Sequence, residues 1–197
     1  LITTAGFRDI LEMGTEQRYD IYDLFLEFPD PLVPRRLRRE VTERVDRDGR
    51  VITALNEDDV RAELRHLAAA GCQAVAVALI NAYANPAHER RIGEIARAEW
   101  PAMSVTLSTD IVPELGEYQR TVTAAANAYV QPLMATYVSR LERELSARGF
   151  LGTLRLMHSA GGLVSPSTAK SEPIRLLESG PAGGGLATAL FGTGAGH

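Results

Sequence analysis

The stretch Ala74-Val75-Ala76-Val77-Ala78-Leu79-Ile80 decides the fold class, because it is a continuous apolar run of strand length. Such a run is typical of a central strand that is buried on both faces of a sheet. Just before it, Asn56 is placed to cap a helix over residues 57–70, and Gly71 is placed to close that helix. Apolar residues recur at helical spacing between them, so a helix is predicted to lead into the strand.

The residues after this run repeat the alternation of helix and strand. Asn85-Pro86 predicts the first turn of a helix that ends at Trp100-Pro101. Residues 103–107 then predict another strand, and residues 1–4 predict one at the beginning of the chain. Helices of this length between buried strands indicate an α/β layered domain.

The region between the first strand and the first long helix is less regular. Residues 15–39 contain several prolines and are predicted to be irregular. Asp48-Gly49 predicts a hairpin turn between a weakly alternating strand at 40–47 and a returning strand at 51–52. The prolines at 29–34 mark the one candidate domain boundary.

The longest helical stretch covers residues 118–148. Its predicted core face consists of Val122, Ala126, Tyr129, Leu133, Tyr137, Leu141 and Leu145. Pro132 lies in its middle, which predicts either a kink or two helices that meet there. Residues 154–157 predict one more buried strand.

Composition excludes several classes of protein. A formal net charge of -4 without a basic cluster argues against nucleic acid as the main partner. No apolar run reaches the roughly 20 residues of a membrane span, and no leader is legible, so we expect a cytoplasmic protein. The single cysteine excludes an internal disulfide, and the four scattered histidines predict no metal site.

A glycine-rich loop follows residues 174–177, which are apolar enough to predict a short strand. The residues Ser179-Gly180-Pro181-Ala182-Gly183-Gly184 combine a hydroxyl, a sharp Gly-Pro turn and the start of a small-residue helix. The free N–H groups of such a helix start suit a phosphate. A tight packing turn explains the same glycines, and spacing alone leaves both interpretations open.

A second glycine motif, Ser159-Ala160-Gly161-Gly162, also follows a predicted strand. Ligand-binding loops gather at the carboxyl ends of strands in open α/β sheets, so two such loops suggest one shared nucleotide cleft. The Gly-Lys-Ser/Thr of a Walker A loop and the G-x-G-x-x-G of a dinucleotide fold are both absent from residues 179–184.

Polar residues crowd the start of the long helix. Arg120, Thr123 and Asn127 share one face, which suggests contacts to substrate or nucleotide, although caps and exposed surface would look alike. His158 ends a predicted strand, where a packed neutral ring, a base and a ligand are all open interpretations.

Eight short motifs occur in an order that resembles one family. They are Thr3-Thr4-Ala5-Gly6-Phe7-Arg8-Asp9, Pro31-Leu32-Val33-Pro34-Arg35, Glu43-Arg44-Val45-Asp46-Arg47-Asp48-Gly49, Ala76-Val77-Ala78-Leu79, Asn85-Pro86-Ala87-His88-Glu89, Glu117-Tyr118-Gln119-Arg120-Thr121, Asn127-Ala128-Tyr129-Val130-Gln131-Pro132 and Glu178-Ser179-Gly180-Pro181-Ala182-Gly183-Gly184. Together they resemble the hydantoinase A / 5-oxoprolinase family, which includes acetone carboxylase β-type subunits.

This resemblance implies an actin-like ATPase fold of the sugar kinase, Hsp70 and ribonuclease H type. It implies that ATP and a divalent metal, Mg, activate a cyclic amide, cyclic imide or ketone by phosphorylation, often with a hydantoinase B-type subunit. The implied nucleotide contacts are Ser179, Gly180, Pro181, Ala182, Gly183, Gly184, Gly161 and Gly162. The implied substrate contacts are Arg120, Thr121, Thr123, Asn127, His158 and Ser159; the catalytic residues are not assigned.

The family's Asp-x-Gly-Gly-Thr phosphate loops are absent from this sequence. We therefore expect an internal fragment that is incomplete as an ATPase domain, inactive alone and without bound ATP. Residues 1–55 would end an N-terminal hydantoinase/oxoprolinase region, and 56–197 would form the α/β portion of the next domain. The alternatives are a non-catalytic scaffold of the same fold and a subunit of an ATP-dependent ketone carboxylase.

Overall fold

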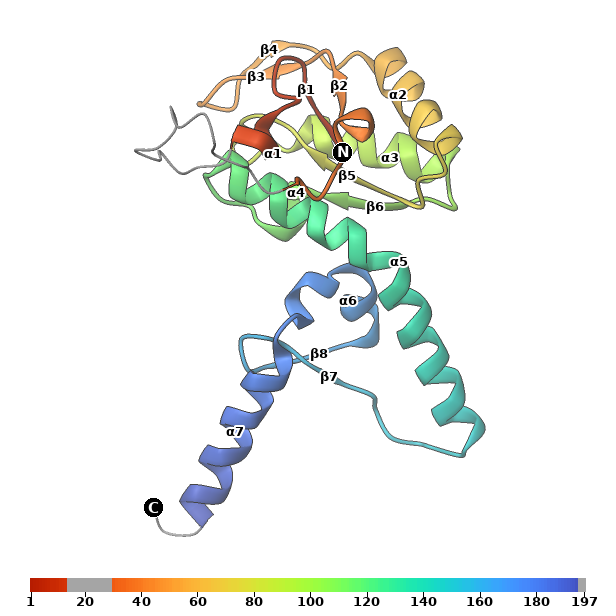
Figure 1. Cartoon of the computed structure of the whole chain (residues 1–197), viewed down its shortest axis with the longest axis vertical. Coiled ribbons are helices and arrows are strands. Elements are labelled where there is room, and N and C mark those ends of the chain that lie inside the picture. Colours follow the sequence, from red (N-terminus) through yellow and green to blue (C-terminus); the bar gives the residue numbers. More distant parts are fainter. Residues whose placement is uncertain (14–29, 195–197) are drawn as a thin grey trace. The chain divides into compact units, whose positions relative to one another are not determined.

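The computed structural model describes residues 1–13 and 30–194 (Figure 1). The chain divides into two compact units, Leu1–Tyr129 and Val130–His197. The irregular region predicted over 15–39 lies mostly outside the described residues, and its described end contains a short 3-10 helix, η1 (Arg35–Leu37). The domain boundary predicted after residue 55 stays a prediction.

The first unit is built on a parallel sheet with strand order β2-β1-β5-β6. These strands are β1 (Ile2–Thr4), β2 (Arg39–Val41), β5 (Ala74–Ala78) and β6 (Ser104–Leu107). Ile2 pairs with both Arg39 and Val77, so β1 lies inside the sheet. The predicted α/β class is confirmed.

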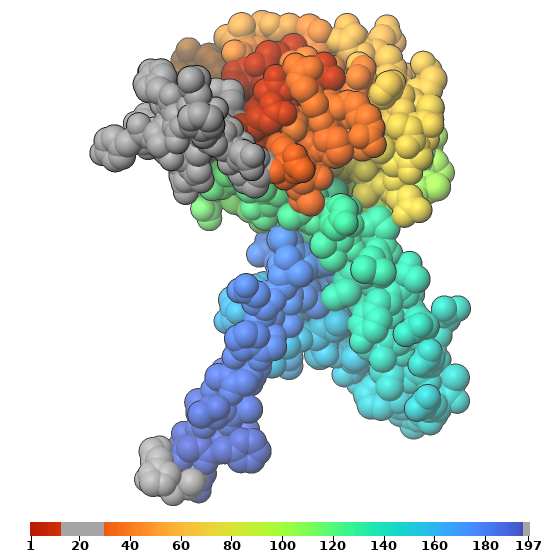
Figure 2. Space-filling model, in the orientation of Figure 1, coloured from red at the N-terminus to blue at the C-terminus, as the bar shows by residue number. Residues whose placement is uncertain are grey.

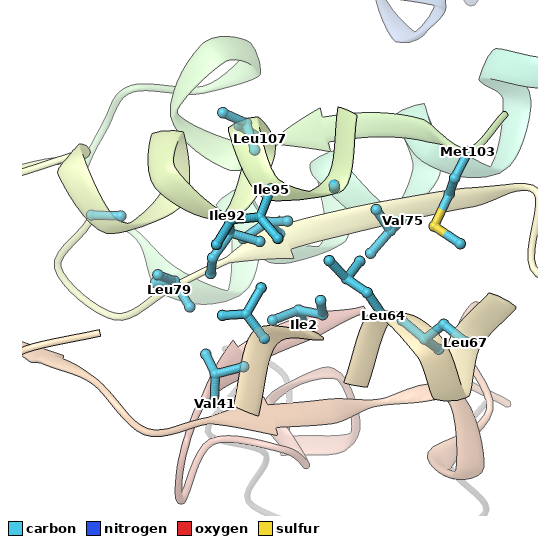
Figure 3. Close-up of a cluster of buried hydrophobic side chains, with 14 residues drawn as sticks. Ile2, Val41, Leu64, Leu67, Val75, Leu79, Ile92, Ile95, Met103 and Leu107 are labelled. Atoms are coloured by element: carbon cyan, nitrogen blue, oxygen red, sulfur yellow. The ribbon is translucent and has the colours of Figure 1, made fainter. Parts of the chain in front are cut away.

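Strand β5 is buried on both faces, as its apolar run predicted. Val75 and Val77 belong to a core cluster with residues of helices α2 (Glu57–Ala69) and α3 (Ala87–Glu99), seen in Figure 3. Ala76 and Ala78 point to the opposite face, where they pack with alanines of helix α5 (Glu117–Ala147) and with Leu11 of α1 (Ile10–Met13). Alanine on this face lets the helix backbone approach the sheet closely.

Local signals account for the ends of several elements. The Asn56 side chain accepts hydrogen bonds from the N–H groups of Asp58 and Asp59 and so caps α2. Gly49 has φ 83° in the hairpin between β3 (Arg44–Val45) and β4 (Val51–Thr53), which confirms the predicted turn. The single strand predicted over 40–47 is wrong, because its beginning pairs with β1 and its end pairs with β4.

The core face predicted for the long helix is wrong at Tyr129, Leu133 and Tyr137, which are exposed, whereas Val122 packs against the core as predicted. Tyr129 is 73% exposed and Leu133 is 74% exposed, whereas Ala124, Ala125 and Ala128 are buried. The reason is that the strands opposite α5 present alanines, so small residues fit where large apolar ones would not. The helix assignment runs through Pro132 without a break, so the alternative of two helices is also wrong.

The second unit contains a short antiparallel hairpin of β7 (Leu156–Met157) and β8 (Leu163–Val164). The buried strand predicted over 154–157 is therefore wrong in length and burial, since β7 is only half-buried. The small core of the second unit contains Val138, Ala169 and Leu176. Ser165 caps α6 (Pro166–Ser171), a helix that was not predicted, and η2 (Pro173–Leu176) and α7 (Ser179–Gly194) follow.

A short helix, α4 (Ser108–Ile111), follows directly on β6 in the first unit. Among the helices in the described ranges, none is both long enough and apolar enough to cross a membrane.

Candidate functional site

The candidate site lies where the carboxyl ends of the parallel strands meet. Open α/β sheets bind ligands at this edge. Here β1 ends at Thr4, β5 continues into Leu79 and Ile80, and β6 continues into Ser108. Hydrogen bonds from these residues converge on a small set of buried charged side chains from α3 and α5.

A buried ion pair, Glu89 with Arg120, is the centre of this set. Both side chains are fully buried, and Arg120 Nη1 lies 3.5 Å from Glu89 Oε1. Glu89 Oε1 accepts from Leu79 N at 2.9 Å and from Ser108 Oγ at 2.6 Å, and Oε2 accepts from the N–H and hydroxyl of Thr109. The carboxylate thereby ties the ends of β5 and β6 to α3.

Arg120 connects the same strand ends to α5. Its Nη1 donates to Ser108 Oγ at 2.8 Å, and its Nη2 donates to the carbonyl of Leu79 at 2.6 Å. Nη2 also contacts the carboxylate of Glu117. Because a buried charge without such partners is costly, these contacts explain how the guanidinium is tolerated inside the unit.

Burial raises the pKa of Glu89 above its ordinary value. The hydrogen bonds from Ser108, Leu79 and Thr109 and the nearby guanidinium of Arg120 act in the opposite direction. Desolvation is the larger effect, because the group is taken wholly out of water.

Glu117 links the buried pair to the surface. Its side chain is 25% exposed, and its Oε1 accepts from Asn81 N at 3.0 Å. Asn81 has φ 56°, a left-handed conformation that asparagine tolerates better than most residues. Its side chain also donates to the carbonyl of Val45 at 2.9 Å, so the loop after β5 is fixed at two points.

A second buried cluster lies beside it. Thr4 Oγ1 donates to Glu43 Oε1 and accepts from Ile80 N at 3.0 Å. Glu43 Oε2 lies 2.8 Å from His88 Nδ1, and the His88 side chain is 12% exposed. A carboxylate on one ring nitrogen orients an imidazole and fixes its tautomer, so this cluster holds His88 in one position.

A cavity of about 750 Å³ borders the first of these clusters, because Glu117 lies in its wall. It is lined by Gly6, Phe7, Arg8, Asp9, Ile10, Arg35, Glu40, Gly116, Glu117, Tyr118 and Gln119. In the space-filling view, the segment that follows β1 (red) adjoins the segment that leads into β2 (orange) (Figure 2). All of the lining residues lie within Leu1–Tyr129, so the cavity belongs to the first unit alone.

The predicted substrate residues of the long helix also lie in the first unit. Arg120 and Asn127 are fully buried and Thr121 is 2% exposed, while Thr123 is half-buried. Asn127 Nδ2 donates to Thr106 Oγ1 at 3.0 Å, and Thr121 Oγ1 donates to the carbonyl of Glu117 at 2.7 Å. These bonds attach α5 to the sheet; direct contact with substrate or phosphate stays a prediction.

The predicted nucleotide loop begins helix α7 in the second unit. The chain reverses at Glu178, which has φ 62°, and not at Gly180-Pro181, which lies inside the first turn of the helix. The strand predicted over 174–177 is wrong, because Pro173 starts the 3-10 helix η2 there. Gly180 and Gly184 have no atom within 4 Å of the place where a Cβ would stand, so their backbone is open to a ligand.

The second glycine motif forms the β7–β8 turn. Gly161 has φ 88°, and the His158 ring accepts from Ala160 N at 2.9 Å. Ser159 donates from both its N–H and its hydroxyl to the carbonyl of Arg175, at 2.8 and 2.7 Å. The motif is therefore adjacent to the residues that lead into α7. Nucleotide binding by Gly161, Gly162 and residues 179–184 stays a prediction.

Several residues of the site were missed in the sequence. Glu89, Glu43 and Ser108 carried no predicted role, although Glu89 and His88 lie in one of the family motifs. A legible signal existed for Glu89, because it lies three and seven residues before Ile92 and Ala96 on the buried face of α3. An acidic residue on such a face requires buried partners.

Metal ligands are not gathered in this part of the chain. Within residues 1–13 and 30–194, no group of three or more His, Cys, Asp or Glu side chains is arranged to hold an ion.

Comparison with known proteins identifies the family. The "Hydantoinase/oxoprolinase N-terminal region" family model matches residues 1–100, and the "Hydantoinase/oxoprolinase" model matches residues 120–197. An uncharacterized protein of Methanocaldococcus jannaschii is 39% identical over 97% of this chain, and the acetophenone carboxylase gamma subunit of Aromatoleum aromaticum is 34% identical over 97%. This chain spans 28% of the length of each relative.

Comparison with solved structures supports the same family. The crystal structure of the ATP-dependent caprolactamase from Pseudomonas jessenii matches with a TM-score of 0.84 and 30% identity, over 97% of this chain and 28% of that one. This likeness confirms the predicted α/β fold class of the family's ATPases. Since the two family models together match nearly the whole sequence, the chain belongs to the hydantoinase/oxoprolinase family.

Proposed function

We propose that this chain is part of an ATP-dependent enzyme that activates a cyclic amide or imide by phosphorylation and opens its ring. The observation that carries the proposal is the likeness to the ATP-dependent caprolactamase, which extends over 97% of this chain. Phosphorylation of an amide oxygen converts a poor electrophile into a reactive one, and such an enzyme needs a clamp for the transferred group.

The first turn of α7 fits the phosphates of ATP. The N–H groups at the start of a helix lack intrahelical acceptors, and the helix dipole favours an anion there. Ser179 adds a hydroxyl, and the open space beside Gly180 and Gly184 leaves their backbone accessible. When bound, ATP supplies the phosphoryl group; the residues Ser179 to Gly184 would bind and orient its phosphates.

The described residues do not fit a magnesium site, because they gather no set of acidic ligands. We therefore assign no metal ligand to this chain and derive no step through Mg²⁺.

The experiment is to measure ADP formation by the full-length protein that carries this chain, with and without a cyclic amide such as ε-caprolactam. ADP formation that depends on the amide, together with the ring-opened acid, is the expected result. ATP consumption that no cyclic amide or imide stimulates would refute the proposal. The matched control is the 197-residue chain alone, which we expect to be inactive.

A ketone carboxylase subunit is the second candidate function. The observation in its favour is the 34% identity to the acetophenone carboxylase gamma subunit. The two functions share the activation of a carbonyl oxygen and differ in the reaction of the activated compound, which is either ring opening or carboxylation. ATP consumption that requires both a ketone and bicarbonate would select the carboxylase, and consumption with an amide alone would select the amidohydrolase.

Partners and a purely structural role are tested separately. We propose that a hydantoinase B-type subunit binds the full-length protein, because the relatives include a named subunit of a larger enzyme. Co-purification of the two gene products tests this. Calorimetry with Mg-ATP tests the scaffold alternative, since a scaffold would release no heat at millimolar nucleotide.

A further inference from the structure

The cluster of Thr4, Glu43 and His88 has no part in the function proposed so far. The Glu43 side chain is fully buried, and its Oε2 lies 2.8 Å from His88 Nδ1. Its other oxygen accepts from the hydroxyl of Thr4, which in turn accepts from Ile80 N at 3.0 Å. The carboxylate is therefore held by the ends of β1 and β5, at the edge of the sheet where open α/β folds bind ligands.

Glu43 decides which ring nitrogen of His88 carries the proton. A carboxylate only accepts hydrogen bonds, so Nδ1 is the donor and the neutral ring keeps a lone pair on Nε2. When Nε2 takes up a second proton, the buried carboxylate pairs with the positive ring. A carboxylate that orients and stabilises an imidazole in this way is the partner that a histidine base needs.

The Nε2 atom of His88 is open to solvent. Within residues 1–13 and 30–194, the one hydrogen bond of the ring is the contact of Nδ1 with Glu43. Nε2 is not one of the side-chain atoms in these ranges that are buried without a partner, so it must have accessible surface. The side chain as a whole is 12% exposed. A molecule from solution can therefore reach this nitrogen.

The carboxylate of Glu89, the next residue of α3, does not compete for the ring. Its Oε1 accepts from Leu79 N and Ser108 Oγ, and its Oε2 accepts from Thr109. Within the described residues, Glu43 is accordingly the charged group that contacts His88.

Both candidate reactions release a proton when the carbonyl compound is activated. As the phosphoryl group moves from ATP, one electron pair of the carbonyl double bond forms the new O–P bond, and ADP leaves with the pair of the broken P–O bond. The carbon then forms a new double bond, to nitrogen in a cyclic amide or to the neighbouring carbon in a ketone. The electron pair for it comes from an N–H or C–H bond, whose proton needs an acceptor.

We propose that His88 is the general base that takes this proton on Nε2, and that Glu43 is its positioning residue. The inference rests on the proposed function, and it holds for the amide and for the ketone because each releases the proton. The N–H or C–H bond breaks, the proton moves to Nε2, and the imidazolium that forms is paired with the Glu43 carboxylate. Thr4 contributes by holding Glu43.

Chemical modification of the full-length protein tests whether substrate reaches His88. Diethyl pyrocarbonate acylates accessible, unprotonated imidazole, and mass spectrometry of the digest measures each histidine. His88 should react, and ε-caprolactam or acetophenone with a non-hydrolysable ATP analogue should protect it. At about ten times its Kd, the protecting ligand should slow the reaction about elevenfold, the factor 1 + [L]/Kd. His66, which is exposed on α2, is the internal control and should react equally with and without ligand.

Turnover tests the proton transfer itself. His88→Gln should lower the kcat of amide-dependent or ketone-dependent ADP formation by about 10²–10⁴-fold, the usual contribution of a general base, with little change in KM. Imidazole added to His88→Ala should restore part of the rate, which a merely structural role would not allow. Glu43→Gln should also lower kcat, because an amide does not stabilise the imidazolium. Imidazole should not rescue this variant, since its own ring is still present.

The matched control for turnover is His66→Gln, which should leave kcat and KM unchanged. Melting temperatures identify any variant that fails to fold. If both His88 variants fail to fold, the protection experiment decides, because it uses the unchanged protein.

The outcomes separate this proposal from the proposed function. If neither compound protects His88, or if the folded His88 variants turn over as the unchanged protein does, the inference is overturned; ADP formation that depends on an amide or a ketone would still support the proposed function. Lost turnover that imidazole does not restore in His88→Ala would also overturn it, because the ring would then be structural. If the unchanged protein forms no ADP with either class of compound, the proposed function fails and the base role falls with it.

Discussion

Removal of one partner from the buried pair of Glu89 and Arg120 should destabilise the first unit strongly. Arg120→Met leaves the Glu89 carboxylate fully buried without its counter-ion and deletes the bonds to Ser108 and to the carbonyl of Leu79. Breaking a buried pair in this way costs about 3–5 kcal/mol. Glu89→Gln keeps an acceptor oxygen but loses the charge, and it should cost about 1–3 kcal/mol.

The effects of the two substitutions on the free energy of unfolding should not be additive, because each substitution removes the buried charge that the other one leaves unpaired. With both charges gone, the double variant Glu89→Gln/Arg120→Met should be more stable than the sum of the single effects predicts, by more than about 0.5 kcal/mol. Urea unfolding followed by circular dichroism measures all four proteins. Arg90→Met is the matched control, since Arg90 is exposed on the same helix as Glu89, and its effect should stay within about 0.5 kcal/mol.

The pH dependence has a definite sign. The pKa of Glu89 is raised by burial from its ordinary value of 4.5, so the folded state keeps this proton at pH values where the unfolded chain has lost it. This contribution to stability is complete below pH 4.5 and is lost as the pH rises through the folded pKa. The Arg120→Met penalty should therefore shrink toward low pH, where Glu89 becomes neutral.

Two results would refute this reasoning. Additive single effects would show that Glu89 and Arg120 do not interact. An Arg120→Met penalty that does not shrink as the pH is lowered would show that the charge of Glu89 does not set the cost.

Three smaller predictions concern single positions. Asn56→Ala removes the cap of α2 and should lower the free energy of unfolding by about 1 kcal/mol, measured by urea unfolding; an unchanged midpoint would mean that the cap bonds are not formed in solution. Gly49→Ala should lower the free energy of unfolding by more than Gly71→Ala does. Both glycines have positive φ, but of the two only Gly49 has an atom, the Ala84 carbonyl oxygen, 3.0 Å from where a Cβ would stand. Equal melting temperatures of the two variants would contradict this. Gly184 and Gly192 both occupy open positions in α7, so Gly184→Ala and Gly192→Ala should each add about 0.5–1 kcal/mol to helix stability. Only Gly184→Ala should weaken ATP binding. Equal nucleotide affinity of the two variants would remove Gly184 from the proposed site.

The sequence was most informative where local chemistry fixes local structure. The apolar run of β5, the Asn56 cap and the Asp48-Gly49 turn were predictable, because each depends on neighbours within a few residues. The α/β class followed from the spacing of such elements. The family followed from the order of its motifs.

The sequence misled where burial depends on what lies opposite. Tyr129 and Leu133 looked like core residues of α5, yet the alanines of β5 select Ala124, Ala125 and Ala128 to pack against the sheet. Helix periodicity identifies an apolar stripe but does not say which stripe meets a partner.

The sequence by itself determined strand β5 and the helices on either side of it, the fold class and the family of this protein. The tertiary structure alone decided the partners of its buried charges. Glu89 and Arg120 lie 31 positions apart in the sequence and meet only because α3 and α5 both reach the carboxyl edge of the sheet. A buried charge is tolerated when several distant groups converge on it, and that convergence is a property of the folded chain.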